Sequence, residues 1–207
     1  GGGGGFDPPD ETDDRTDDEQ PDLVYSDVPE DAWYRAAVLR LAEMGVVAGY
    51  PDGTYRPDNG ITRAQMAALI SRALGGASTE PSDTEARSFS DVPEDAWYGS
   101  AVRHLASLGV VQGCGDGSSY CPDSVVTRAQ MALFLHRAHN LEPPDSASPS
   151  FEDVGADHYA YEAVESLRAA GITAGCQSEP ALYCPDGVVT RAQMAVFLSR
   201  SLDRSGS

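Results

Sequence analysis

The hexapeptide Thr62-Arg63-Ala64-Gln65-Met66-Ala67 decides the fold, because the chain carries it three times. It returns at residues 127–132 and 190–195, at offsets of 65 and 63 residues. An Asp-Val pair opens each copy and recurs at a similar spacing, so two separate strings follow one period. Such a period predicts three copies of one structural unit that pack together to share a core. The copies are placed at residues 23–79, 87–142 and 149–204, after a tail at residues 1–22.

The second half of each copy has the pattern of an amphipathic helix. Thr62 and Gln65 form a Thr-x-x-Gln capping box, in which each side chain bonds a free amide at the helix start. Behind them, Met66, Leu69 and Ile70 follow the i, i+3, i+4 spacing of one helix face. We therefore expect a helix that begins at Thr62 and turns Met66 into the core, and the same in the other two copies.

The first half of each copy predicts a shorter helix before a long loop. In the first copy Asp31 is the expected N-cap, Trp33, Val38 and Leu41 give an apolar stripe, and Gly45 ends the helix. One pair of short helices cannot enclose a core, but three pairs can turn their apolar stripes toward one axis. The predicted fold is therefore mainly α, with three helix-loop-helix repeats in a pseudo-threefold arrangement around a central three-helix bundle.

The arginine of the hexapeptide stands at an unusual place. It recurs as Arg63, Arg128 and Arg191, at the first helical position, where the helix dipole favours acidic residues. A guanidinium beside free helix amides is suited to trapping an anion. The same arginine could instead pair with an Asp of a neighbouring repeat and lock the assembly. Both interpretations stay open at this point.

Two further positions recur in every copy. The opening acid, which could form a local turn or bond sugar hydroxyls, is Asp27, Asp91 and Asp153. We favour the turn, because Asp side chains readily bond the backbone two residues on. An early aromatic is Trp33, Trp97 and Tyr159. We expect these rings in the core, although exposed rings could also stack on sugar faces.

The four cysteines form two local pairs. Cys114 and Cys121 align with Cys176 and Cys184, and the first copy lacks both members. Residues that are absent together act together, so the repeat selects Cys114–Cys121 and Cys176–Cys184 from the three possible connectivities. A zinc site is disfavoured, because the spacings are wrong and no histidine is near. Disulfides indicate an oxidising location outside the cytoplasm.

The charge excludes several classes of function. Acidic residues outnumber basic ones by 33 to 14, and a net charge of −19 disfavours general nucleic-acid binding. The chain has no lysine, which excludes lysine-based catalysis, and no apolar run long enough to insert into a membrane. Residues 1–22 hold nine acids and one arginine, so they are predicted to be a disordered acidic linker.

Taken in order, these strings resemble the S-layer homology (SLH) repeat. The Phe-x-Asp-Val opening, the Trp-Tyr pair, the Gly-Tyr-x-Asp-Gly-Thr-Tyr loop and the Ile-Thr-Arg-Ala-Gln helix start carry the resemblance, over about residues 23–204. It implies a non-catalytic module, secreted to the bacterial cell surface, that binds an anionic secondary cell-wall polysaccharide, pyruvylated in many members. It also implies grooves between the repeats of a monomeric pseudo-trimer.

The resemblance implies the following carbohydrate-binding residues: Arg63, Arg128, Arg191, Asp27, Asp91, Asp153, Trp33, Trp97, Gly49, Gly113 and Gly175. The family's Glu after Thr-Arg-Ala is Gln here, and the third copy replaces Trp by Tyr159. Arg→Ala is expected to weaken binding without lowering stability.

Three other functions compete with anchoring as interpretations of these residues. A protein–protein assembly module would place the arginines in repeat interfaces. A glycosidase is disfavoured because the acids repeat threefold rather than forming one couple. The histidines do not share one repeat position, and the loops lack calcium-binding spacing, so no metal or other cofactor is expected.

Overall fold

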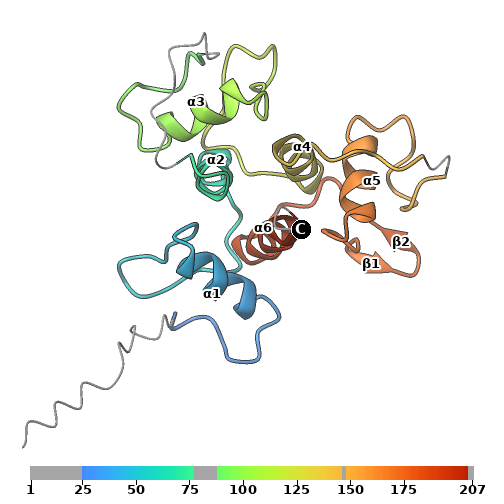
Figure 1. The fold of residues 1–207 in the computed structure, drawn as a ribbon, viewed down its shortest axis with the longest axis horizontal. Coiled ribbons are helices and arrows are strands. Elements are labelled where there is room, and N and C mark those ends of the chain that lie inside the picture. The colour runs from blue at the N-terminus through green and yellow to red at the C-terminus, as the bar shows by residue number, and fades with distance from the viewer. Residues whose placement is uncertain (1–24, 77–87, 146–147, 205–207) are drawn as a thin grey trace, which may run out of the picture.

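The computed structural model describes residues 25–76, 88–145 and 148–204, and the predicted acidic linker at 1–22 lies outside them. Three helix-loop-helix repeats surround one axis, as Figure 1 shows. We call their described parts repeat one (25–76), repeat two (88–145) and repeat three (148–204). The helices are α1 (Arg35–Glu43), α2 (Arg63–Ala73), α3 (Gly99–Ser107), α4 (Arg128–Ala138), α5 (Tyr161–Ala169) and α6 (Arg191–Arg204), and repeat three adds a hairpin of β1 (Gln177–Ser178) and β2 (Ala181–Leu182).

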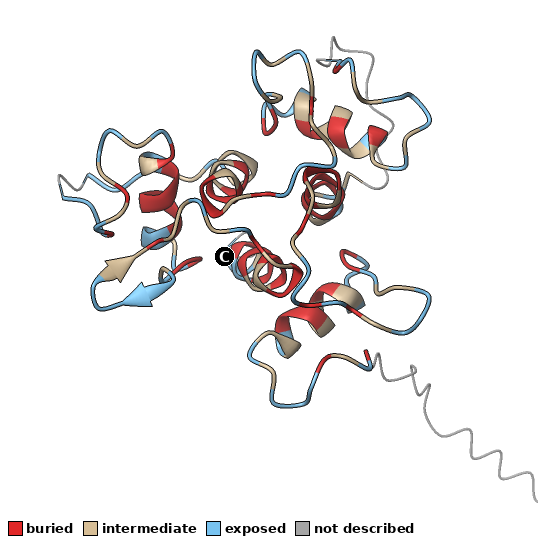
Figure 2. Cartoon of the chain, turned by 180° about the vertical axis from the view of Figure 1, so that it is seen from behind, coloured by how far each residue is buried: buried red, intermediate tan, exposed pale blue. Residues whose placement is uncertain are grey.

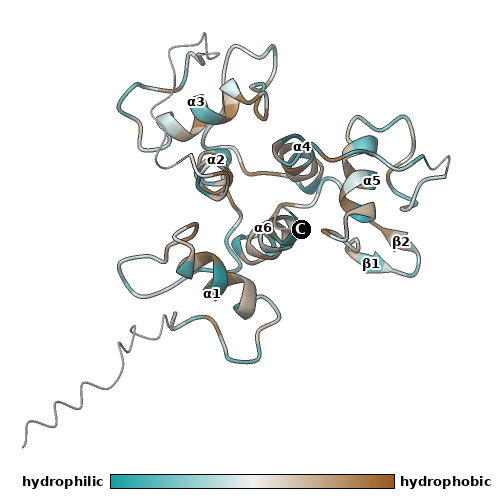
Figure 3. Cartoon of the chain, in the orientation of Figure 1, coloured by the Kyte–Doolittle hydropathy of each residue, from teal (hydrophilic) through white to brown (hydrophobic). Residues whose placement is uncertain are grey.

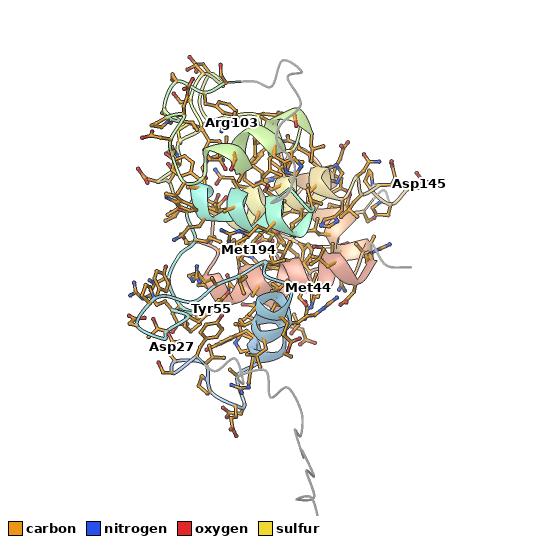
Figure 4. The ribbon with its side chains drawn as sticks, turned by 60° about the vertical axis from the view of Figure 1, so that its left-hand side comes forward. Asp27, Met44, Tyr55, Arg103, Asp145 and Met194 are labelled. Atoms are coloured by element: carbon orange, nitrogen blue, oxygen red, sulfur yellow. A yellow bond between two sulfur atoms is a disulfide. The ribbon has the colours of Figure 1, made fainter. Side chains whose placement is uncertain are left out.

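The second helix of each repeat forms the centre of the molecule. The three hexapeptide methionines, Met66, Met131 and Met194, are fully buried, as predicted. Figure 2 shows the buried residues gathered on the inner helices, and Figure 4 places Met194 in the middle of the molecule. In Figure 3, hydrophilic residues mark much of the outer loops. The core therefore lies along the axis, as the three apolar stripes require.

The first helix of each repeat packs on the second helix of the preceding repeat. Thus α3 lies against α2, α5 lies against α4, and α1 lies against α6, which joins the two ends of the chain into a closed ring. The packed unit is therefore built from two repeats rather than one. This places any groove at a repeat boundary.

Short backbone bridges join the three repeats where the central helices begin. Thr62 pairs with Val125 and Thr127 pairs with Val188, while Gly60 pairs with Thr190. The amide of Arg63 also donates to the carbonyl of Ser124, so the free amides at this helix start are bonded by the next repeat. The helix N-termini are thus part of the assembly.

The helix boundaries agree with the sequence at the second helix and differ at the first. Thr62 and Gln65 form the predicted capping box, and so do the equivalent pairs of α4 and α6. Asp31 is not an N-cap, however, because turns continue to Tyr34 and α1 begins at Arg35. Gly45 follows the helix with φ 69°, a conformation that suits a glycine stop.

Candidate functional site

The opening aspartate of each repeat holds a distant loop. The Asp27 carboxylate accepts from the amides of Tyr55 and Arg56, at 2.6 and 2.7 Å, and Figure 4 shows Asp27 close to Tyr55. Asp91 and Asp153 do the same, with amide distances of 2.6 to 2.8 Å to Tyr120, Cys121, Tyr183 and Cys184. Two consecutive amides that converge on one anion form a nest-like site. The prediction that this aspartate forms a local turn was therefore wrong, because its hydrogen-bond partners lie 28 to 31 residues away along the chain.

The hexapeptide arginines join neighbouring repeats. Arg63 Nε donates to the Tyr120 carbonyl at 2.7 Å, and the Tyr120 hydroxyl donates back to the Arg63 carbonyl at 2.8 Å. Arg128 forms this reciprocal pair with Tyr183, and Arg191 forms it with Tyr55, across the ring closure. Each guanidinium also lies over its tyrosine ring, at 4.5 to 4.7 Å from the centroid. The inter-repeat interpretation is thus confirmed in its location, but the partner is a carbonyl and not an aspartate.

Burial gives these groups unusual electrostatics. Arg63, Arg128 and Arg191 are 5, 5 and 8% exposed. Desolvation lowers the pKa of the Arg63 and Arg128 side chains and raises the pKa of Tyr55 to about 12. None of the three arginines forms an ion pair among the described residues. Each repeat boundary therefore buries a positive charge that no carboxylate neutralises by direct contact.

One of the three guanidinium groups has a free donor. Arg63 Nη2 donates to the Gly113 carbonyl at 3.4 Å, and Arg191 Nη2 donates to the Ala48 carbonyl at 3.2 Å. Arg128 Nη2 is buried and has no hydrogen-bond partner among the described residues. A buried donor without an acceptor costs about 1–3 kcal/mol, so among the three guanidinium groups this nitrogen would gain most from an added acceptor.

The early aromatics are exposed, which corrects the expectation that they lie in the core. Trp33, Trp97 and Tyr159 are 66, 64 and 64% exposed. Because the first helix begins later than predicted, these rings precede it and are not part of its buried stripe. Trp33 contacts Tyr34 edge-on, with centroids 5.4 Å apart, and His158 stacks on Tyr159. The rings are therefore available as flat surfaces for a ligand.

Two cavities collect the recurring residues from all three repeats. The Trp33 groove, of about 340 Å³, is lined by Trp33, Arg128, Thr173, Ala174, Gly175, Cys176, Gln193, Val196, Phe197 and Arg200. The Trp97 groove, of about 160 Å³, is lined by Ala48, Gly49, Tyr50, Gln65, Ala68, Leu69, Arg72, Trp97 and Arg191. Each groove takes its loop and second helix from one repeat, its buried arginine from the preceding repeat and its tryptophan from the following one, counted around the ring.

At the third repeat boundary, the equivalent predicted residues do not line one common cavity. Arg63 and Gly113 are bonded to each other, and neither lines the cavity that contains Tyr159. Gly175 has a structural role as well, because its φ is 91° and a Cβ atom would meet Phe151. Asp27, Asp91 and Asp153 do not line either groove, and their carboxylates bond loop amides instead.

The structure adds groove residues that the sequence argument missed. Arg72 and Arg200 line the two grooves, and each lies nine residues after a hexapeptide arginine. Arg137 occupies the same position in repeat two. Alignment of the three copies could have found this second arginine, since it recurs as regularly as the first.

The loop beside each groove is closed in one of two ways. Cys114–Cys121 and Cys176–Cys184 are disulfide-bonded, which confirms the predicted pairing. In repeat one the same positions hold Tyr50 and Arg56, and the Arg56 guanidinium lies 3.8 Å from the Tyr50 ring centroid. Arg56 also pairs with Asp52 at 2.9 Å.

Among the described residues, no group of three or more His, Cys, Asp and Glu side chains is placed to hold a metal ion. The described helices include none with the length and apolar character needed to cross a bilayer.

Residues 24–67 and 88–132 match the S-layer homology domain family. The chain is 31% identical to S-layer protein EA1 of Bacillus anthracis over 84% of its length, and 30% identical to cell surface glycoprotein 1 of Acetivibrio thermocellus over 75%. It is also 29% identical to an amylopullulanase of Thermoanaerobacterium thermosulfurigenes over 90% of its length.

The chain spans only 20, 7 and 10% of the length of these three relatives, so its similarity to an enzyme concerns a small part of that enzyme. Their names place two of them at the cell surface, and the two disulfides agree with a location outside the cytoplasm. The chain thus carries two S-layer homology repeats, at residues 24–67 and 88–132, and belongs at the bacterial cell surface.

Proposed function

We propose that this chain is a non-catalytic anchoring module that binds an anionic cell-wall polysaccharide, with or without pyruvylation, in the grooves between its repeats. The observation that carries the proposal is the free Nη2 donor of Arg128 in the Trp33 groove. A carboxylate or phosphate of a polymer would accept from this nitrogen. It would also neutralise a guanidinium that is 95% buried without an ion-pair partner among the described residues.

The rim of the groove suits a sugar. Trp33 is 66% exposed and lies in the same cavity as Arg128, so a pyranose ring can stack on the indole while its acidic group reaches inward. Arg200 lies in the groove as a second cation. A buried cation and an exposed aromatic ring together favour an acidic sugar over a neutral one.

Binding in this proposal depends on local contacts. The net charge of −19 repels an acidic polymer at long range, so added salt should raise the association rate until the groove contacts themselves are screened. Charge-assisted hydrogen bonds inside a partly buried groove are screened much less than exposed charges.

We also propose that residues 149–204 form a third repeat of the same family, beside copies at 23–79 and 87–142. The third copy has the capping box of Thr190, the clamp of Asp153 and the buried Arg191. It differs by having Tyr159 and a hairpin in its loop, and the family match covers residues 24–67 and 88–132. A monomeric ring of three repeats is the assembly that we propose.

A matched pair of variants tests the function. Trp33→Ala should weaken binding to purified cell wall about tenfold, the worth of one good contact, while the folded state keeps its stability because the ring is exposed. Trp97→Ala changes an equally exposed ring beside a smaller groove, whose arginine donor is already bonded, and should have a smaller effect.

The second arm of the experiment measures binding to cell wall that has been stripped of its non-peptidoglycan polymer. Equal binding to stripped and intact wall, or wild-type binding by both tryptophan variants, would refute the proposal. In that case self-association of the chain should be measured, because relatives such as S-layer protein EA1 make surface-layer assembly the alternative function.

A further inference from the structure

A third cavity lies between α4 and α5 and differs from both grooves. It has a volume of about 400 Å³, and its polar and aromatic lining consists of His136, Arg137, His158, Tyr159, Tyr161 and Glu162. We call it the His136 cavity. By the order of the repeats it takes the place of a third groove, but no hexapeptide arginine lines it.

The two imidazoles are specific to this cavity. The positions of His136 and His158 are occupied by Ser71 and Ala96 beside the Trp97 groove. Beside the Trp33 groove they are occupied by Ser199 and Ala32. The cavity therefore contains titratable groups that the other two lack.

Hydrogen bonds decide which tautomer each imidazole adopts when it is neutral. The Ser166 hydroxyl donates to the Glu162 carbonyl at 2.7 Å, so it accepts from Nδ1–H of His136, 3.1 Å away. The neutral His136 ring then has its lone pair on Nε2. His158 Nδ1 accepts from the Ala160 amide at 3.1 Å, which leaves the proton on Nε2. One ring thus offers an acceptor and the other a donor.

The two charges in the lining of the cavity, Arg137 and Glu162, cancel while His136 is neutral. Arg137 lies on the same helix as His136, Glu162 lines the cavity from α5, Glu142 follows α4, and His158 lines the same cavity. Burial and, to a lesser degree, Arg137 lower the pKa of His136, and the two glutamates oppose this shift. Near neutral pH the cavity holds one cation and one carboxylate in its lining, and protonation of His136 adds a second cation.

We propose that the His136 cavity is an anion-binding site distinct from the Trp33 and Trp97 grooves, and that it takes a carboxylate-bearing sugar when His136 is protonated. Nε2–H of the imidazolium donates to the carboxylate, Arg137 supplies the second positive charge, and the exposed ring of Tyr159 supports the sugar. The proposal rests on the proposed function only for the choice of a sugar as the ligand.

Glucuronate is a suitable probe, because its carboxylate stays ionised over the range in which histidine titrates. The C–H signals of the His136 ring, followed by NMR, should shift on addition of glucuronate and not on addition of glucose. Glucuronate should bind about tenfold more tightly at about pH 5 than at about pH 8. By linkage, the bound sugar acid should raise the pKa of His136. Equal affinity at the two pH values, or an equal response to glucose, would overturn the proposal.

His136→Asn gives a matched variant, since the amide nitrogen can keep the bond to Ser166 without titrating. It should abolish the pH dependence of glucuronate binding. The control is His104→Asn, because His104 Nδ1 makes the same bond to Ser71, 2.9 Å away, but does not line the Trp97 groove. That variant should bind glucuronate like the wild type, and a loss there as large as at His136 would overturn the assignment.

The outcomes separate this site from the anchoring function. The wild-type titration decides the matter even if His136→Asn fails to fold. If glucuronate leaves His136 unaffected while Trp33→Ala weakens wall binding, the cavity proposal fails and the anchoring proposal stands. If glucuronate binds at His136 and neither tryptophan variant affects wall binding, the reverse holds.

Discussion

The loop of repeat one and the loops of repeats two and three reach one shape by different chemistry. Arg56, Cys121 and Cys184 all have a φ of 58°, and each donates its amide to the opening aspartate of its repeat. Two of the loops are closed covalently, and the third is closed by Arg56 stacked on Tyr50. The aspartate clamp is thus the common element, and the cross-link is an addition to it.

This difference in loop closure predicts that the three loops tolerate mutations unequally. A cation–π contact at an exposed site contributes about 0.5–1 kcal/mol. A disulfide across a loop of this size contributes about 2.5 kcal/mol in the chain-entropy model. Repeat one should therefore depend most on its aspartate, and repeats two and three should tolerate its loss better.

Loss of the Asp27 carboxylate should be the most damaging change. Asp27→Ala removes two charge-assisted hydrogen bonds and should lower the free energy of unfolding by about 3 kcal/mol. Asp91→Ala should cost roughly 1 kcal/mol less, because Cys114–Cys121 still restrains its loop. Urea unfolding measures both, with Asp31→Ala as an exposed control. Equal losses at Asp27 and Asp91 would show that the cross-link does not support the clamp.

Removal of one disulfide should come next. Cys114→Ala combined with Cys121→Ala should lower the free energy of unfolding by about 2.5 kcal/mol. A reducing agent should then destabilise this variant less than the wild type, since only Cys176–Cys184 remains to be broken. If reduction leaves the melting temperature of the wild type unchanged, the disulfides do not stabilise the fold.

The non-covalent closure should matter less. Arg56→Ala should cost about 0.5–1 kcal/mol through the lost contact with Tyr50, since exposed ion pairs add little. Tyr50→Phe keeps the ring and should behave like the wild type. A loss for Arg56→Ala as large as that for the cysteine pair would contradict the proposed difference between the loops.

Strong acid should loosen the loop of repeat one, and this is the smallest of the expected effects. Hydrogen bonds from Thr54 and Arg56 lower the pKa of Asp52 to about 2. A lowered folded-state pKa means that the contribution of Asp52 is complete above its unfolded pKa and is lost as pH falls through about 2. Amide exchange at Thr54, which donates to Asp52, should therefore accelerate in strong acid. Asp52→Asn should remove this dependence, while the disulfide loops stay closed.

The hexapeptide arginines show where a sequence argument needs the fold. Their position predicted either an anion site or a strut between repeats, and the structure gives them a bond of the second kind. Arg63→Ala is therefore expected to lower stability, contrary to the expectation from the helix dipole alone. The difference arises because burial and the Tyr120 carbonyl outweigh a dipole effect of about 0.3–1 kcal/mol.

The prediction that the early aromatic residues are buried was wrong for a different reason. Trp33 was assigned to the core because a large ring near a helix start is commonly buried. The helix begins at Arg35, two residues after it, and the burial of a side chain just outside a helix depends on the path of the chain there. No periodicity extends to such a residue, so its exposure could not be read from the sequence.

The threefold repeat, the capped central helices and the cysteine pairing could be predicted from the amino-acid sequence, because each of these is a matter of local spacing. Three other features required the fold: each first helix packs on the preceding repeat, α1 closes the ring on α6, and the arginine donors are satisfied unequally. These features depend on which segments meet along the chain, from 30 residues apart for His136 and Ser166 to 159 residues apart for Arg40 and Ser199. The three copies share the capping box and the opening aspartate, so the positions at which they differ, such as His136 and Tyr159, make one boundary unlike another.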